Sequence, residues 1–84
     1  MSVIVYTKDG CHLCENVVST LHKIHSEKSF ELSLRDITSS KELFERFRNI
    51  IPVVEIDGKI RLAGSVLANR HTLEDVLRRS LFQE

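Results

Sequence analysis

The spacing of hydrophobic positions changes several times along this chain, and each change predicts an element. Residues 3–6 form a continuous apolar run, which is typical of a strand covered on both faces. From residue 11 the apolar positions fall about four residues apart, as they do on one face of a helix. That face contains Leu13, Val17, Leu21 and Ile24, with Val18 beside it. We expect this helix to end near residues 25–28.

The middle of the chain predicts a second strand and a second helix. Apolar and polar residues alternate from residue 30, and the predicted buried face consists of Phe30, Leu32 and Leu34. Ser39 and Glu42 have the spacing of a capping box, which predicts that a helix begins at Ser39. Pro52 is expected to stop this helical stretch, because proline cannot continue a helix. The apolar stripe of the helix contains Leu43, Phe44 and Phe47.

The last third of the chain predicts a hairpin followed by a helix. Residues 53–56 are mostly apolar and predict a third strand. Asp57 and Gly58 are a strong signal for a two-residue hairpin turn, and Gly64 is expected to end the strand that follows. Ile60 and Leu62 alternate in that strand. A last helix is expected from Thr72, with an apolar face formed by Leu73, Val76, Leu77 and Leu81.

The predicted order of elements is therefore β-α-β-α-β-β-α, which is an α/β fold. Strands that alternate with helices indicate parallel pairing, and the hairpin adds an antiparallel edge. We expect a four-stranded mixed sheet with helices on both faces. With 84 residues the chain has the size of one domain, so residues 1–84 are expected to form a single one.

Charge and hydropathy narrow the range of partners and the compartment. The 12 basic and 12 acidic residues cancel, which argues against a broad electrostatic grip on nucleic acid or on an anionic membrane. No apolar stretch approaches the ~20 residues of a membrane span, and residues 3–6 are too short for the core of a signal peptide. We therefore expect a cytoplasmic monomer, in a compartment where thiols are normally kept reduced.

The two cysteines of the chain, Cys11 and Cys14, lie at the junction of the first strand and the first helix. Unpaired backbone N–H groups and the helix dipole favour negative charge at such a junction, and the thiolate is the reactive form of cysteine. We assign Cys11 as the nucleophile, with an expected pKa of ~4–7 against ~8.5 for free cysteine. Cys14 lies within the first turn and is assigned as the resolving thiol. The pair predicts thiol–disulfide exchange through a mixed disulfide.

Two residues near Cys11 carry or gain positive charge. Lys8 precedes Cys11 by three residues, and His12 follows it directly. His12 changes its protonation near neutral pH, so a charge there would stabilise the thiolate and make the disulfide more oxidising. The alternative, that His12 simply points to solvent from the first turn, stays open from sequence.

In this order of elements, the Cys-x-x-Cys pair resembles the thioredoxin fold, and specifically its glutaredoxin branch. The matching features are the segment KDGCHLC at residues 8–14, Pro52 at the start of the third strand, the hairpin at residues 57–58 and Gly64. The resemblance implies a glutaredoxin-like thiol–disulfide oxidoreductase. It also implies that Pro52 is cis, that the backbone near Ile51 is free to bond an extended substrate, and that Lys8 contacts glutathione.

The region after the fourth strand is a further candidate for substrate binding. Gly64 and Ser65 are expected to offer backbone N–H groups to a substrate carboxylate, although a simple turn fits the same residues. The family usually places an acidic or polar pair after two glycines, whereas residues 63–66 read AGSV. The expected substrate is a disulfide-containing protein or a glutathione mixed disulfide. No resident cofactor is expected, and the reductant is glutathione or an enzyme of the thioredoxin-reductase type.

Two other kinds of function fit the same residues. Cys11 and Cys14 are half of the ligand set of a structural zinc site, so a metal or an iron–sulfur cluster would have to be shared across a dimer interface. The fold also serves as a scaffold for binding modules without catalysis.

Overall fold

A computed structural model describes residues 1–69 and 71–82, without the side chain of Ser65, and its elements follow the expected order. The strands are β1 (Ser2–Thr7), β2 (Glu31–Asp36), β3 (Val53–Ile56) and β4 (Lys59–Ala63). The helices are α1 (His12–His25), α2 (Lys41–Phe47) and α3 (Leu73–Phe82), with short 3₁₀ turns η1 (Ile37–Ser39) and η2 (Gly64–Leu67). Among the described residues, no helix is long and apolar enough to cross a membrane.

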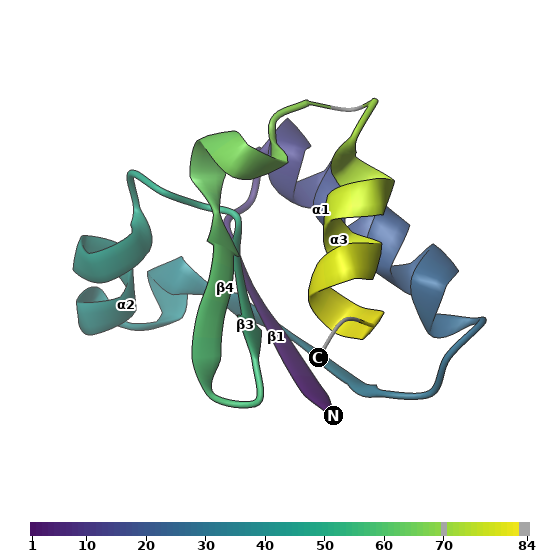
Figure 1. Ribbon diagram of the computed structural model, residues 1–84. Coiled ribbons are helices and arrows are strands. Elements are labelled where there is room, and N and C mark those ends of the chain that lie inside the picture. The colour runs from purple at the N-terminus through teal and green to yellow at the C-terminus, as the bar shows by residue number, and fades with distance from the viewer. Residues whose placement is uncertain (70, 83–84) are drawn as a thin grey trace.

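The four strands form one mixed sheet in the order β2-β1-β3-β4. β1 runs parallel to β2 and antiparallel to β3, and β4 returns antiparallel to β3. α2 lies on one side of this sheet, and α1 and α3 lie on the other (Figure 1). The predicted α/β architecture, with helices on both faces, is confirmed.

β1 is one of the two inner strands, and it is buried on both of its faces. Val3 and Val5 belong to a larger core under α1 and α3, whereas Ile4 and Tyr6 face a smaller core under α2. This two-sided burial explains why β1 has a continuous apolar run rather than an alternating pattern.

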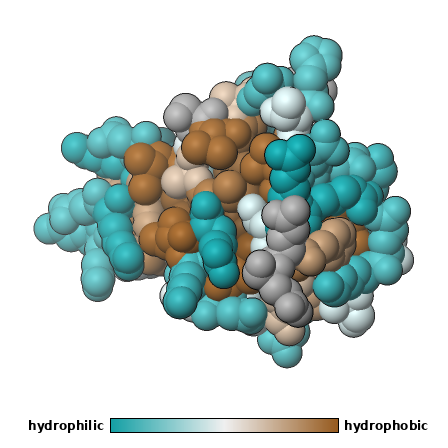
Figure 2. All heavy atoms as spheres, in the orientation of Figure 1, coloured by the Kyte–Doolittle hydropathy of each residue, from teal (hydrophilic) through white to brown (hydrophobic). Residues whose placement is uncertain are grey.

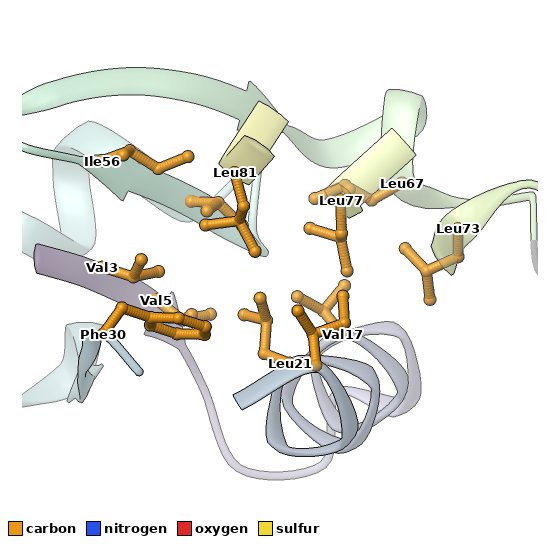
Figure 3. Packing of buried hydrophobic residues seen from close by; sticks show 12 residues of the cluster. Val3, Val5, Val17, Leu21, Phe30, Ile56, Leu67, Leu73, Leu77 and Leu81 are labelled. Atoms are coloured by element: carbon orange, nitrogen blue, oxygen red, sulfur yellow. The ribbon is translucent and has the colours of Figure 1, made fainter. Parts of the chain in front are cut away.

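The larger core joins one face of the sheet to the apolar stripes of α1 and α3 (Figure 3). Side chains three or four residues apart point the same way from a helix, so each stripe meets the sheet along its length. Most of the predicted positions are buried: Val17, Leu21 and Ile24 from α1, and Leu73, Leu77 and Leu81 from α3. Val18 and Val76 are partly buried against this core, and Leu13 is partly buried outside it. The helical periodicity is thus confirmed by the packing.

The prediction that Leu34 is buried is wrong. Leu34 is 50% exposed, whereas Leu32 packs against the larger core and Phe30 is buried. β2 is an edge strand, so its side chains have a neighbouring strand on one side only. The alternating pattern identified the strand correctly but did not show where along the strand the helical cover ends.

The predicted start of α2 is wrong by one residue. Ser40 is the N-cap, and its Oγ accepts a hydrogen bond from the N–H of Leu43 at 3.4 Å. Ser39 instead ends η1, and its hydroxyl donates to the carbonyl of Asp36 at 2.7 Å. Because Asp36 caps η1 first, α2 begins one residue later than the sequence predicts. α2 also ends at Phe47, before Pro52 can act on it.

β4 contains an irregularity that the sequence did not reveal. Leu62 lies opposite Val54 and Ile60 lies opposite Glu55, so Arg61 is an extra, unpaired residue in the ladder. This bulge places Ile60 on the other face from Leu62, where it is 43% exposed. The simple alternation expected for this strand is therefore wrong. Bulges of this kind are common at sheet edges.

The hairpin and the end of β4 both use positive φ angles. Asp57 and Gly58 have φ of 50° and 85°, as the predicted tight turn requires. Gly64 has φ of 51°, and a Cβ at this position would lie 3.2 Å from the carbonyl oxygen of Ile50. The backbone of residue 64 therefore comes close to the loop before β3, and only glycine fits there without displacement.

Gly64→Ala should lower the free energy of unfolding by about 1–3 kcal/mol, from backbone strain and the contact with Ile50. Gly58→Ala is the matched control, because Gly58 also has positive φ but has no heavy atom within 4 Å of an added Cβ. The control should lose about 1 kcal/mol from backbone strain alone. Urea denaturation of both variants measures the difference, and equal losses would contradict a role for the close approach.

Tyr6 reports on the packing between the sheet and α2. Burial, and then the charge and hydrogen bond of Glu55, raise the pKa of Tyr6 above its ordinary value of 10.0; its hydroxyl donates to Glu55 Oε1 at 3.3 Å. The folded state therefore favours the neutral phenol. Its contribution to stability is complete below pH 10 and is lost as the pH rises through the pKa of the folded protein.

Glu55→Gln should move the pKa of Tyr6 part of the way back toward 10.0, because burial still acts after the charge is removed. The chain has one tyrosine and no tryptophan, so an absorbance titration at alkaline pH follows Tyr6 alone. An unchanged midpoint in the variant would contradict the proposed effect of Glu55.

Candidate functional site

Cys11 is the N-cap of α1 and is held by the first turn of that helix. Its backbone is extended, with φ of −93° and ψ of 102°, and its carbonyl accepts from the N–H of Glu15 at 3.1 Å. Its sulfur accepts a hydrogen bond from the N–H of Cys14, with a nitrogen–sulfur distance of 3.1 Å. The sulfur thus occupies the position of a capping oxygen, where the helix dipole favours negative charge.

Cys14 lies one turn into α1 and differs from Cys11 in exposure. Cys14 is 2% exposed and Cys11 is partly exposed. Their Cα atoms are 5.2 Å apart, and their sulfur atoms lie at disulfide-bonding distance. Cys11 is therefore the more exposed residue of the pair and Cys14 the buried one.

The loop that contains Pro52 lies at the same end of the sheet as the cysteines. Tyr6 is paired with Val53, and Val53 is paired with Ala63, so the loops after β1, before β3 and after β4 converge there. The Ile51–Pro52 peptide bond is cis, as the resemblance implied, and Pro52 is buried. This convergence brings the regions of Cys11, Ile51 and Gly64 together from distant parts of the sequence.

The backbone of Ile51 forms no hydrogen bonds with the described part of the chain. Its side chain is partly buried against the smaller core. Within the described residues, neither its N–H nor its carbonyl takes part in a hydrogen bond. A free N–H and carbonyl at the start of a strand can pair with one residue of an extended chain.

One expectation for Gly64 is wrong. Its N–H donates to the carbonyl of Pro52 at 2.9 Å, so it is not available to a substrate carboxylate. This hydrogen bond is part of the close contact between η2 and the loop before β3. The same close contact explains why glycine is needed at residue 64. The corresponding role of the Ser65 N–H stays a prediction.

Lys8 and His12 occupy different surroundings. The Lys8 ammonium lies 5.7 Å from the ring centroid of Phe44, and its charge contributes, after the hydrogen bonds from Thr38, to a lowered pKa of Asp36. The His12 side chain is 95% exposed, and its Nδ1 lies 3.6 Å from a carboxylate oxygen of Glu15. The predicted contact of Lys8 with glutathione and the effect of His12 on Cys11 stay predictions.

An apolar surface near the cysteines was not found by sequence reasoning. Ile50 and Val66 are exposed, and Ile50 lies against the backbone of Gly64. In Figure 2 hydrophobic surface gathers around η2, at the end of the sheet where the three loops converge. The sequence signal for this apolar surface was the pair of adjacent isoleucines at residues 50 and 51. The end of a helix and the start of a strand do not require two large apolar residues in a row.

A concave region lies between the loop after β1 and α1. A groove of about 500 Å³ is lined by the loop at residues 7–10 and by Cys14, Val18 and His22 of α1. The Pro52 loop does not contribute to it. Metal ligands do not gather in the described part of the chain, where no group of three or more His, Cys, Asp or Glu is close enough to hold an ion.

A Cys-x-x-Cys pair at the N-terminus of the first helix, facing a cis-proline loop on this mixed sheet, defines a thioredoxin-fold protein of the glutaredoxin-like class. The chain belongs to the glutaredoxin-like domain family, which matches residues 2–80. The family match therefore confirms the resemblance drawn from the cysteine segment and the hairpin.

The solved structures that are similar to this chain include the following two. Protein Ne2328 from Nitrosomonas europaea, solved by NMR, is 26% identical and has a TM-score of 0.65, with 76% of this chain and 78% of that chain covered. A crystal structure of a point mutant of the thioredoxin-like protein BC3987 is 17% identical, with a TM-score of 0.54 and 90% and 99% of the two chains covered. The second likeness concerns the fold alone. No curated protein sequence matches the chain.

Proposed function

We propose that this protein is a dithiol–disulfide oxidoreductase that acts through Cys11 and Cys14. The observation that carries the proposal is the difference between the two sulfurs: Cys11 caps α1 and is partly exposed, and Cys14 is buried at bonding distance from it. A reactive thiol needs access and a lowered pKa, whereas a resolving thiol needs only to reach its neighbour.

The reaction follows from this arrangement in two displacements. The Cys11 thiolate attacks one sulfur of a substrate disulfide, that bond breaks, and the other substrate sulfur leaves as a thiolate. Cys14, after losing its proton to solvent, then attacks the Cys11 sulfur and releases the second substrate thiolate. Two electrons pass to the substrate, and a thiol reductant of the cytoplasm, such as glutathione or an enzyme of the thioredoxin-reductase type, reduces the Cys11–Cys14 disulfide again.

The surroundings of Cys11 favour a polypeptide disulfide over a glutathione mixed disulfide as the substrate. Glutathione carries two carboxylates, and the N–H of Gly64, one expected donor to such a group, is already bonded to Pro52. The exposed apolar side chains of Ile50 and Val66 instead suit hydrophobic residues that flank a substrate cysteine. The free backbone groups of Ile51 suit an extended main chain.

Steady-state turnover tests the function and the substrate class. The reduced protein should catalyse reduction of bis(2-hydroxyethyl) disulfide with dithiothreitol as the donor, and Cys11→Ser should be inactive. Insulin disulfides should then be reduced with a higher kcat/KM than a glutathionylated peptide. Failure with the small disulfide would overturn the oxidoreductase, and a preference for the glutathionylated peptide would overturn the substrate class alone.

A further inference from the structure

Strand β2 is an open edge of the sheet. Its paired neighbour is β1, and within the described residues no other strand lies beside it. Apart from the partly buried Leu32, all of its residues are exposed, including Leu34 at 50%. An edge of this kind presents N–H and C=O groups, and here an apolar side chain, to another chain.

The backbone groups of β2 that point outward belong to Leu32, Leu34 and Asp36, and the carbonyl of Asp36 is already bonded to the Ser39 hydroxyl. The N–H of Glu31 donates to the carbonyl of Met1 at 3.0 Å, so Glu31 directs its backbone groups toward β1. In a parallel ladder this direction alternates along the strand, so Ser33 and Arg35 also face β1. A new strand on this edge would therefore have to bond to the two leucines.

We propose that two copies of this chain join their β2 strands in antiparallel fashion about a twofold axis at Ser33. In this register Leu32 lies opposite the partner's Leu34, so that the outward-pointing N–H and C=O groups of one copy can bond to those of the other. Glu31 lies opposite the partner's Arg35, and the symmetry makes this ion pair twice. Registers shifted by two residues place either charged residue opposite the partner's Ser33 and lose both pairs.

The two faces of the joined strands are also complementary. Leu32 packs against the larger core, so Leu32 and Leu34 point to the side of α1, and the leucines of both chains form one cluster there. Arg35 points to the opposite side, where its charge acts on Tyr6. The proposed dimer interface therefore buries Leu34 on one face of the joined strands and pairs opposite charges on the other face.

The other edge of the sheet does not suit a second copy. Lys59 and Arg61 of β4 are both positive, and the bulge at Arg61 interrupts the ladder. Joining β2 to the β4 strand of another copy would leave free edges and continue as a filament, whereas β2 with β2 closes as a dimer. Cys11 follows β1 and stays open in both copies, at opposite ends of the extended sheet. This inference replaces the monomer expected from the sequence.

Sedimentation equilibrium of charge variants tests the proposed register. Glu31→Arg and Arg35→Glu should each weaken the wild-type dimer about tenfold or more, because both symmetric ion pairs become repulsive. The double variant E31R/R35E should regain the wild-type Kd within about threefold. An equal mixture of the two single variants should form mixed dimers, since each again meets opposite charges. A wild-type protein that stays monomeric at millimolar concentration, or single variants with unchanged Kd, would overturn the proposal.

A second pair of variants separates this edge from the other one. Leu34→Lys should abolish dimerisation, whereas Ile60→Lys on β4, which replaces a similarly exposed side chain, should leave the Kd unchanged. Both side chains are exposed, so thermal unfolding should show that each variant is folded. Equal loss of the dimer in both variants would contradict β2 as the interface.

Discussion

Replacing Cys14 with serine should leave Cys11 joined to its substrate in a stable mixed disulfide. The serine cannot displace the substrate thiol, so the reaction stops after the first step. After incubation of the reduced variant with bis(2-hydroxyethyl) disulfide, mass spectrometry should find one substrate half attached at Cys11. Turnover should fall in the same variant, because the second displacement must come from an external thiol.

Cys11→Ser is the matched control for this experiment, and it should form little adduct. Its remaining sulfur belongs to Cys14, which is 2% exposed. Turnover should fall by about a thousandfold or more, as when other enzymes lose their nucleophile. Equal adduct formation by the two variants would show that the assigned roles of the cysteines are wrong.

Phe47→Ala should be among the most destabilising single substitutions in the chain. Phe47 is the buried residue of α2, is 1% exposed, and lies with its ring centroid 4.6 Å from that of Tyr6. Phe47 is the largest of the fully buried side chains, so its truncation removes a large volume from the smaller core. Truncation should cost about 3–5 kcal/mol of unfolding free energy, as for other buried phenylalanines.

Phe82→Ala provides the control, because Phe82 is 37% exposed at the end of α3. It should lose about 1 kcal/mol or less, mainly from its contact with the Lys28 ammonium, which lies 4.6 Å from the ring centroid. Urea denaturation gives both values. A loss at Phe47 no larger than at Phe82 would contradict the view that Phe47 is the main anchor of α2 on the sheet.

Features set by local spacing were predictable from the sequence. The run at residues 3–6 identified a strand buried on both faces, because the larger and the smaller core both contain residues of this strand. The placement of Cys11 before a helical stripe predicted its position at the start of α1, because an N-cap is a local property of the chain. The hairpin followed from two residues that tolerate positive φ.

Features that depend on distant partners were not predictable in this way. The exposure of Leu34 depends on β2 being an edge strand, and the position of Ile60 depends on a bulge opposite β3. The N–H of Gly64 is occupied because the carbonyl of Pro52 meets it across the hairpin. None of these contacts produces a pattern in the neighbouring sequence, so each can be recognised only in the folded structure.

The pH dependence of alkylation in the reduced protein tests the central claim most directly. Iodoacetamide reacts with the thiolate, so its rate at each cysteine, followed by mass spectrometry, gives the ionisation of that thiol. We expect Cys11 to be modified first, with a midpoint below the ~8.5 of free cysteine, and Cys14 to stay largely protected. A midpoint at or above that value, or equal modification of the two sulfurs, would contradict the assignment of Cys11 as an activated nucleophile at the end of α1.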